Sequence, residues 1–298
     1  MTFQIRSFTE KDLPTLVELF NEAYREAYEF TPINEEKFHS WIREGNFTVL
    51  VAEENGMVVG SVSHRSGHWG EEIEWLLTSK GPDQKLIENV LVNEIEKRVI
   101  GEAVFTVADA GSPKITEWME RGYKPEGGLY HMVARLNDVK PLPEVPKGIT
   151  MRSLKPGEEK EFVEAVNAGF DWERVEQGVI ERWKSQNPMF NEEWIHVAEH
   201  ENKIISIVVA KPDTEYNESC GAKRGYLGPA ATLSEYRGKN LASALTIRAM
   251  NFLYKKGFNS VGLYTSEQNV PSVTLLRKLG FEVGHHWKFL RKNLTQQQ

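Results

Sequence analysis

Tyr236-Arg237-Gly238-Lys239-Asn240-Leu241-Ala242 lies between a run of strand-forming residues, 225–233, and an amphipathic run that begins at Leu241. This order predicts a strand, a tight turn and a helix. The first backbone N–H groups of a helix have no partner inside the helix, and the helix dipole favours negative charge there. With Arg237 and Lys239 close by in the sequence, these N–H groups would suit a phosphate.

The same segment resembles the cofactor-binding turn of the GNAT superfamily of N-acetyltransferases, whose pattern is Arg/Gln-x-x-Gly-x-Gly/Ala. Arg237 and Ala242 match, and Asn240 replaces the middle glycine. Asn accepts a left-handed backbone better than most residues do. A second match follows at the family spacing, from Asn269 and Ser272 to Leu279-Gly280-Phe281. A solvated basic turn is the alternative, and the second match in register argues against it.

An internal repeat with an offset of 146 residues divides the chain. The aligned pairs are Ile5-Arg6-Ser7 with Met151-Arg152-Ser153, Asn21 with Asn167, and Val51-Ala52-Glu53 with Val197-Ala198-Glu199. A repeat of this length is a domain, and the Pro-rich segment 139–148 separates the copies. We predict an α/β protein with a GNAT-like domain at 1–138, a linker at 139–148 and a second GNAT-like domain at 149–298. Each would have a mixed, mostly antiparallel sheet flanked by helices, in a layout resembling tandem GNAT enzymes such as mycothiol synthase.

The first copy departs from the family pattern where the phosphate turn is expected, near Ser79–Lys85. Pro82 removes one backbone N–H, and Asp83 would repel a phosphate. We therefore expect the first domain to have lost acetyl-CoA binding, to support the second and to wall its acceptor pocket.

Composition limits the other function classes. The 298 residues carry a net charge of −7, which argues against nucleic acid as a partner. No apolar run reaches the length of a membrane span and no signal peptide is visible, so we expect no membrane partner and a cytoplasmic protein. Cys220 is interpreted as a small apolar filler, and the His285-His286 pair would face opposite sides of a strand. No spacing predicts a metal site, and nothing in the sequence supports an oligomer.

The resemblance implies that acetyl-CoA is the acyl donor and assigns the residues that hold it. The cofactor-binding set is Ala231, Thr232, Leu233, Arg237, Gly238, Lys239, Asn240, Leu241, Ala242, Ser243, Asn269 and Ser272. The N–H of Leu233 would polarise the thioester oxygen. Many members have a Tyr as the leaving-group acid where this chain has Leu276, so Tyr264 is the catalytic candidate that we carry forward, with Thr265, Tyr226 and Ser272 as alternatives. No general base stands out.

Two functions remain open. The first is an acetyl-CoA-dependent N-acetyltransferase that acts on a primary amine of a small molecule through its C-terminal domain. Its acceptor pocket would be shaped near Phe170, Trp172, Trp183 and Phe190. The second is a catalytically weak or inactive acetyl-CoA-binding sensor or scaffold, in which Leu276 reflects lost catalysis.

Overall fold

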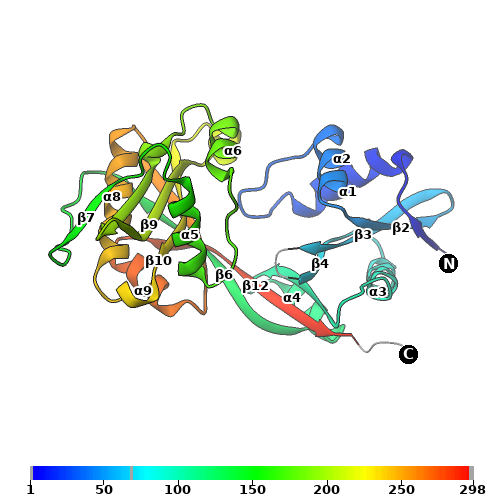
Figure 1. Ribbon diagram of the computed structural model, residues 1–298. Coiled ribbons are helices and arrows are strands. Elements are labelled where there is room, and N and C mark those ends of the chain that lie inside the picture. The colour runs from blue at the N-terminus through cyan, green and yellow to red at the C-terminus, as the bar shows by residue number, and fades with distance from the viewer. Residues whose placement is uncertain (1–2, 68–69, 295–298) are drawn as a thin grey trace. The chain divides into compact units, whose positions relative to one another are not determined.

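The computed structural model describes residues 3–67 and 70–294, which fall into two compact units (Figure 1). Unit 1 contains residues 1–129 and 286–298, and unit 2 contains residues 130–285. The sequence placed the division at 139–148. The structure differs because β6 (Lys124–Arg135) and β12 (Glu282–Asn293) both run across the boundary between the units. Residues 287–293 of β12 pair with β5 of unit 1, so the end of the chain returns to the first unit.

Unit 1 has a mixed sheet in which β1 to β5 lie in sequence order, with the last part of β12 beside β5. Its elements before β6 are β1 (Gln4–Ser7), the short helix η1 (Glu10–Asp12), α1 (Leu13–Tyr24), α2 (Glu35–Glu44), β2 (Thr48–Glu54), β3 (Met57–Gly67), β4 (Gly70–Thr78), α3 (Gln84–Glu96), β5 (Ala103–Asp109) and α4 (Pro113–Glu120). Asn55 and Gly56, which both have positive φ, form the hairpin turn between β2 and β3.

Unit 2 repeats this order. Its elements after β6 are β7 (Ile149–Ser153), α5 (Glu159–Phe170), α6 (Val179–Gln186), η2 (Glu192–Trp194), β8 (Ile195–His200), β9 (Lys203–Pro212), α7 (Thr214–Cys220), β10 (Arg224–Thr232), η3 (Ser234–Tyr236), α8 (Leu241–Lys255), β11 (Ser260–Ser266) and α9 (Val270–Lys278). The strands run β6-β11-β10-β9-β8-β7, with β10 and β11 parallel and β7 to β10 antiparallel. The predicted mixed, mostly antiparallel sheet is thus confirmed.

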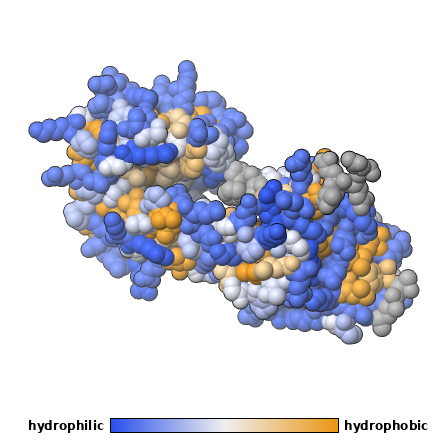
Figure 2. All heavy atoms as spheres, turned by 90° about the horizontal axis from the view of Figure 1, so that it is seen from below, coloured by the Kyte–Doolittle hydropathy of each residue, from blue (hydrophilic) through white to orange (hydrophobic). Residues whose placement is uncertain are grey.

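The core of unit 2 forms around β9, whose residues 204–210 are all buried. A strand with two buried faces must be covered on both sides. Helices α5 and α8 both pack against β9 and β10 (Figure 1). Hydrophilic side chains cover most of the visible surface of each unit, with smaller apolar patches between them (Figure 2).

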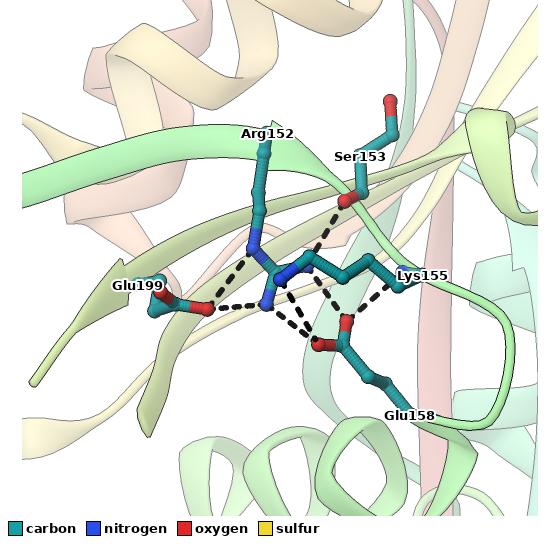
Figure 3. A network of polar contacts seen from close by, with 5 residues as sticks. All are labelled: Arg152, Ser153, Lys155, Glu158 and Glu199. Carbon is teal, nitrogen blue, oxygen red and sulfur yellow. Dashed lines mark hydrogen bonds and ion pairs between the residues drawn. The ribbon is translucent and has the colours of Figure 1, made fainter. Parts of the chain in front are cut away.

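The repeat reappears as two equivalent ion-pair clusters. In unit 2, Arg152 of β7 binds Glu158 before α5 and Glu199 of β8, with a distance of 2.7 Å from Arg152 Nη1 to Glu158 Oε2 (Figure 3). In unit 1, Arg6 makes the same contacts with Asp12 and Glu53, each at 2.7 Å. The three positions differ by 146 in every case, so the cluster fastens the first strand to its neighbour in both copies.

A second repeated contact fixes the segment after the first helix of each unit. The Asn21 side chain makes two hydrogen bonds with the backbone of Ile33, and Asn167 makes two with Val175. The sequence aligned these two asparagines without a role for them.

The interpretation of Cys220 as an apolar filler is wrong. Residues 214–220 form the helix α7, which buries none of its residues. Cys220 lies exposed at the end of that helix.

Candidate functional site

Strands β10 and β11 diverge part of the way along their length. Only residues 224–226 of β10 pair with residues 260–262 of β11, although the strands continue to Thr232 and Ser266. The edge of β10 beyond Tyr226 is therefore not bonded to β11. We refer to the stretch between these two unpaired edges, residues 227–232 of β10 and 263–266 of β11, as the opening.

Hydrogen bonding to β9 decides which N–H groups of β10 face that opening. The N–H of Leu233 donates to the carbonyl oxygen of Ile205 at 3.0 Å. The role that the sequence gave to Leu233 in polarising the thioester is thus wrong, because the sheet already uses this N–H. In an antiparallel pair, hydrogen-bonded and non-bonded residues alternate. Since Ala231 pairs with Ile207 in the same register, its N–H also faces β9, and the N–H groups of Ala230 and Thr232 face the opening.

A bulge at Gly228-Pro229 precedes these two residues, between Leu227 and Ala230 in the register with β9. A bulge shifts the alternation of a strand by one residue. The same strand therefore orients its peptide groups differently on either side of residues 228–229, which a count along the sequence does not reveal.

The predicted phosphate turn lies directly after β10. Gly238 and Asn240 have φ values of 76° and 62°, and Asn240 forms the N-cap of α8. The left-handed conformation explains how Asn replaces the family glycine here. Asn240 makes no side-chain cap hydrogen bond to α8, so the N–H groups of Leu241, Ala242 and Ser243 remain available as the family pattern requires. A Cβ at Gly238 would meet no atom within 4 Å, which shows that the turn is open.

The two cations of the turn have different surroundings. Arg237 donates to the carbonyl oxygens of Thr232 and Gly169, at 3.2 and 2.9 Å, and so joins the end of β10 to the end of α5. The ammonium group of Lys239 lies 4.7 Å from the ring centroid of Tyr236 and is exposed. Of the two, Lys239 is the cation free to meet a ligand, and Arg237 holds the turn in place.

The second predicted cofactor segment caps α9. Asn269 Oδ1 accepts from the N–H of Ser272 at 3.3 Å, and the Ser272 hydroxyl lies 3.3 Å from that of Thr265. These contacts place both residues beside the end of β11. Their contact with a cofactor stays a prediction.

The candidate proton donors occupy the point where the strands diverge. The rings of Tyr226 and Tyr264 are 6.0 Å apart, and Tyr264 also stacks on His131 at 4.7 Å. Burial is the main cause that raises the pKa of Tyr226, so its hydroxyl keeps its proton at neutral pH. Leu276 is 4% exposed within the core of unit 2. It fills space and has no proton to give.

A pocket of about 540 Å³ adjoins the same tyrosine. Its lining comes from α6, the end of β9, the start of α7 and β10, namely Trp183, Gln186, Asn187, Phe190, Lys211, Pro212, Asp213, Thr214, Glu215 and Tyr226. Of the predicted acceptor-pocket aromatics, Trp183 and Phe190 line it, whereas Phe170 and Trp172 lie outside its lining. Lys211 and Asp213 could not be predicted as pocket residues, because a lysine and an aspartate at the end of a strand carry no local signal of a pocket.

Unit 1 has a comparable divergence but a different turn. Its β4 and β5 pair only through Glu72–Phe105 and Ile73–Thr106. The following helix, α3, has Asp83 at its N-cap, as the sequence predicted for a turn that repels phosphate. Loss of acetyl-CoA binding in unit 1 stays a prediction.

Neither a metal cluster nor a membrane span is found within residues 3–67 and 70–294. No group of three His, Cys, Asp or Glu side chains there could hold a metal ion. No helix in those ranges is long and apolar enough to cross a membrane.

Comparison with known proteins identifies the type of domain. Residues 157–281 match the model of the Acetyltransferase (GNAT) family. The mycothiol acetyltransferase of Saccharomonospora viridis is 30% identical over 149 residues, which is 48% of each chain. This chain thus spans about half the length of the curated relatives that it matches.

Two solved structures share the fold over nearly the whole chain. A GCN5-related N-acetyltransferase from Sphaerobacter thermophilus aligns with a TM-score of 0.68 and 21% identity, covering 98% of this chain and 95% of that one. A tandem GNAT protein from the clavulanic acid biosynthesis pathway aligns over the full length of both chains, with a TM-score of 0.67 and 15% identity. At these identities the likeness establishes the tandem fold alone.

Proposed function

We propose that this chain, whose residues 157–281 match the model of the Acetyltransferase (GNAT) family, transfers the acetyl group of acetyl-CoA to a primary amine of a small molecule. Unit 2 would carry out the chemistry. The observation that carries this proposal is the opening between β10 and β11, which leads to the open turn at the start of α8.

The residues of this opening fit the two parts of acetyl-CoA. The pantetheine arm contains amide groups, which can pair with the free strand edge at Thr232 as an added strand would. The pyrophosphate suits the N–H groups at the start of α8, where the helix dipole favours negative charge. Lys239, at the same turn, adds a mobile positive charge.

In the proposed reaction, the nitrogen of a neutral amine bonds to the thioester carbonyl carbon. The carbon–sulfur bond breaks, and its electron pair leaves with sulfur. The products are an amide and the thiol of coenzyme A, so nitrogen loses one proton and sulfur gains one. The N–H of Ala230, which is nearer along β10 to the divergence at Tyr226, would stabilise the negative charge on the carbonyl oxygen. Tyr226 and Tyr264, whose rings lie 6.0 Å apart, are proposed as the proton source for sulfur.

A sensor or scaffold that binds acetyl-CoA without turnover is the second candidate. The buried Leu276 favours it, because the position of the usual acid carries a side chain without a proton. Turnover separates the two functions. Release of thiol from acetyl-CoA that depends on an added amine supports the enzyme, whereas tight binding with no release across a broad amine panel supports the sensor.

Binding is tested first, by the rise in melting temperature with acetyl-CoA. We expect Lys239→Glu to weaken acetyl-CoA binding by about tenfold, since a carboxylate near a phosphate replaces an attraction by a repulsion. Lys255→Glu is the matched control, because it makes the same charge change at the other end of α8. Equal affinities for the two variants, or no stabilisation of the wild type, would argue against this site.

A further inference from the structure

The side chain of Lys211 is a cation inside the pocket beside Tyr226. Lys211 lies near the end of β9, and its ammonium nitrogen is 4.9 Å from the ring centroid of Trp183 and 5.5 Å from that of Tyr226. Within the part of the chain that the structure describes, it makes no ion pair with a carboxylate. Cation–π contacts with two rings hold the charged group in place and leave its N–H donors without an anion.

The surroundings of Lys211 are unfavourable for a cation alone. Burial is the main cause that lowers the pKa of Lys211, and the positive charge of Arg174 adds to this effect. Asp213 opposes the shift, but its carboxylate binds the Arg224 guanidinium at 2.7 Å. A partly desolvated cation beside a like charge is stabilised when an anion joins it.

The rest of the pocket limits what that anion can belong to. Trp183, Phe190 and Pro212 provide apolar walls, and Gln186, Asn187 and Thr214 provide polar ones. The carboxylates of Asp213 and Glu215 also belong to the lining. A volume of about 540 Å³ accommodates a small molecule rather than a folded partner. Tyr226 pairs with Gly262, the last residue of β11 before the strands diverge. A ligand that fills the pocket therefore reaches the edge of the proposed acetyl-CoA opening.

We propose that Lys211 binds a carboxylate of the acceptor, so that the substrates of unit 2 are small amines that also carry a carboxylate. This inference rests on the proposed acetyl transfer and names its substrate class. Lys211 would act as a specificity residue, with the carboxylate at one end of the pocket and the amine near Tyr226. It adds no chemical step to the reaction.

Paired acceptors test the proposal directly. Each pair consists of an amino acid and its uncharged carboxamide, with two to six atoms between the amine and the acid. We expect the wild type to prefer the carboxylate of at least one pair by about 10- to 100-fold in kcat/KM, which is the usual effect of one charge-assisted hydrogen bond. Lys211→Met should bring that ratio to about one, and Lys211→Arg should keep most of it. The control is Lys160→Met, which removes an exposed lysine from α5 and should leave the ratio unchanged.

The same experiment distinguishes a different role for this lysine. If neutral Lys211 removed the proton of the amine, Lys211→Met would lower kcat equally for both members of a pair and change the pH profile. That result overturns the proposal, as does a ratio that Lys211→Met leaves unchanged. Melting temperatures of the variants within a few degrees of the wild type show that the pocket is intact.

Failure of the reaction itself has a separate readout. If no acceptor is acetylated, the N-acetylated form of each pair is titrated against the protein by calorimetry. Binding that needs both the carboxylate and Lys211 supports the proposal, and its absence overturns it. Absence of acetyl-CoA binding in the melting assay overturns the proposed function instead.

Discussion

Gly169→Ala should displace the helix that supports the acetyl-CoA opening. Gly169 is next to last in α5, and a Cβ built there would lie 2.8 Å from the Cβ of Ala231 and 3.3 Å from the backbone nitrogen of Thr232. Carbon atoms in contact prefer about 3.5–4.0 Å, so α5 and β10 must separate by about 1 Å. The carbonyl oxygen of Gly169 also accepts a hydrogen bond from Arg237. Through this bond, a displacement of α5 also moves the turn before α8.

The cost follows from the clash and from helix propensity. Overpacking of this size costs about 1–3 kcal/mol, and Ala regains about 0.5–1 kcal/mol over Gly within a helix. We therefore expect the free energy of unfolding of unit 2 to fall by about 1–2 kcal/mol in urea titrations. We also expect the KM for acetyl-CoA to rise, since Thr232 belongs to the strand edge that would hold the cofactor.

A compensating substitution makes this prediction specific. Ala231→Gly removes the atom that the new Cβ would strike, so the double variant should regain about 1 kcal/mol relative to the sum of the two single changes. Gly81→Ala is the control, since a Cβ there meets nothing within 4 Å. Additive effects of the two substitutions, or equal losses in Gly169→Ala and Gly81→Ala, would refute the steric explanation.

Three further predictions concern single residues. Asn240→Ala should cost about 1 kcal/mol and weaken acetyl-CoA binding, whereas Asn240→Gly should retain both properties, because the φ of 62° suits glycine; melting curves with and without acetyl-CoA measure this. Arg152→Met should lower the free energy of unfolding, measured in urea, by about 2 kcal/mol, because it leaves two carboxylates facing each other. The loss should be smaller than the about 3–5 kcal/mol for breaking a fully buried ion pair, since these side chains are 16–23% exposed. Burial, with a smaller effect of Arg248, lowers the pKa of His196 in the folded protein to about 3. Between pH 6.5 and pH 3, His196 is therefore protonated in the unfolded chain but neutral in the folded one. Stability should therefore fall as the pH decreases through this window, by at most about 1.4 kcal/mol per pH unit from this group, and His196→Phe should flatten the slope of the urea midpoint against pH; a slope that the substitution leaves unchanged would show that His196 is not its source.

The turn after β10 could be predicted because its determinants are local. A glycine, a left-handed asparagine and an apolar helix start lie within seven residues, and each constrains the backbone where it stands. Elements of unit 2 such as β9 and α8 were predictable for the same reason, since the continuous apolar run of β9 and the amphipathic pattern of α8 are local features of the sequence.

The peptide groups that face the opening could not be predicted, because they depend on long-range register. The bulge at Gly228-Pro229 and the bond from Leu233 to Ile205 are set by pairing with β9. One residue of slippage exchanges the two edges of the strand, which is how Leu233 was assigned wrongly. The return of residues 287–293 to β5 has the same origin, since that pairing joins segments about 180 residues apart.

The two units differ less in scaffold than in the turn that follows the diverging strand. Both keep the arginine cluster, the asparagine that fixes the segment after the first helix, and a parallel pairing that stops after two or three residues. The arginine cluster and the asparagine contact involve residues far from the turn in the sequence. What changes is the start of the next helix, where Asp83 in unit 1 stands in place of the open, left-handed Asn240 in unit 2. A negative charge at a helix N-terminus uses the same dipole that would otherwise attract a phosphate. If unit 2 alone binds acetyl-CoA, as proposed, a few residues of one turn account for the difference between the two units.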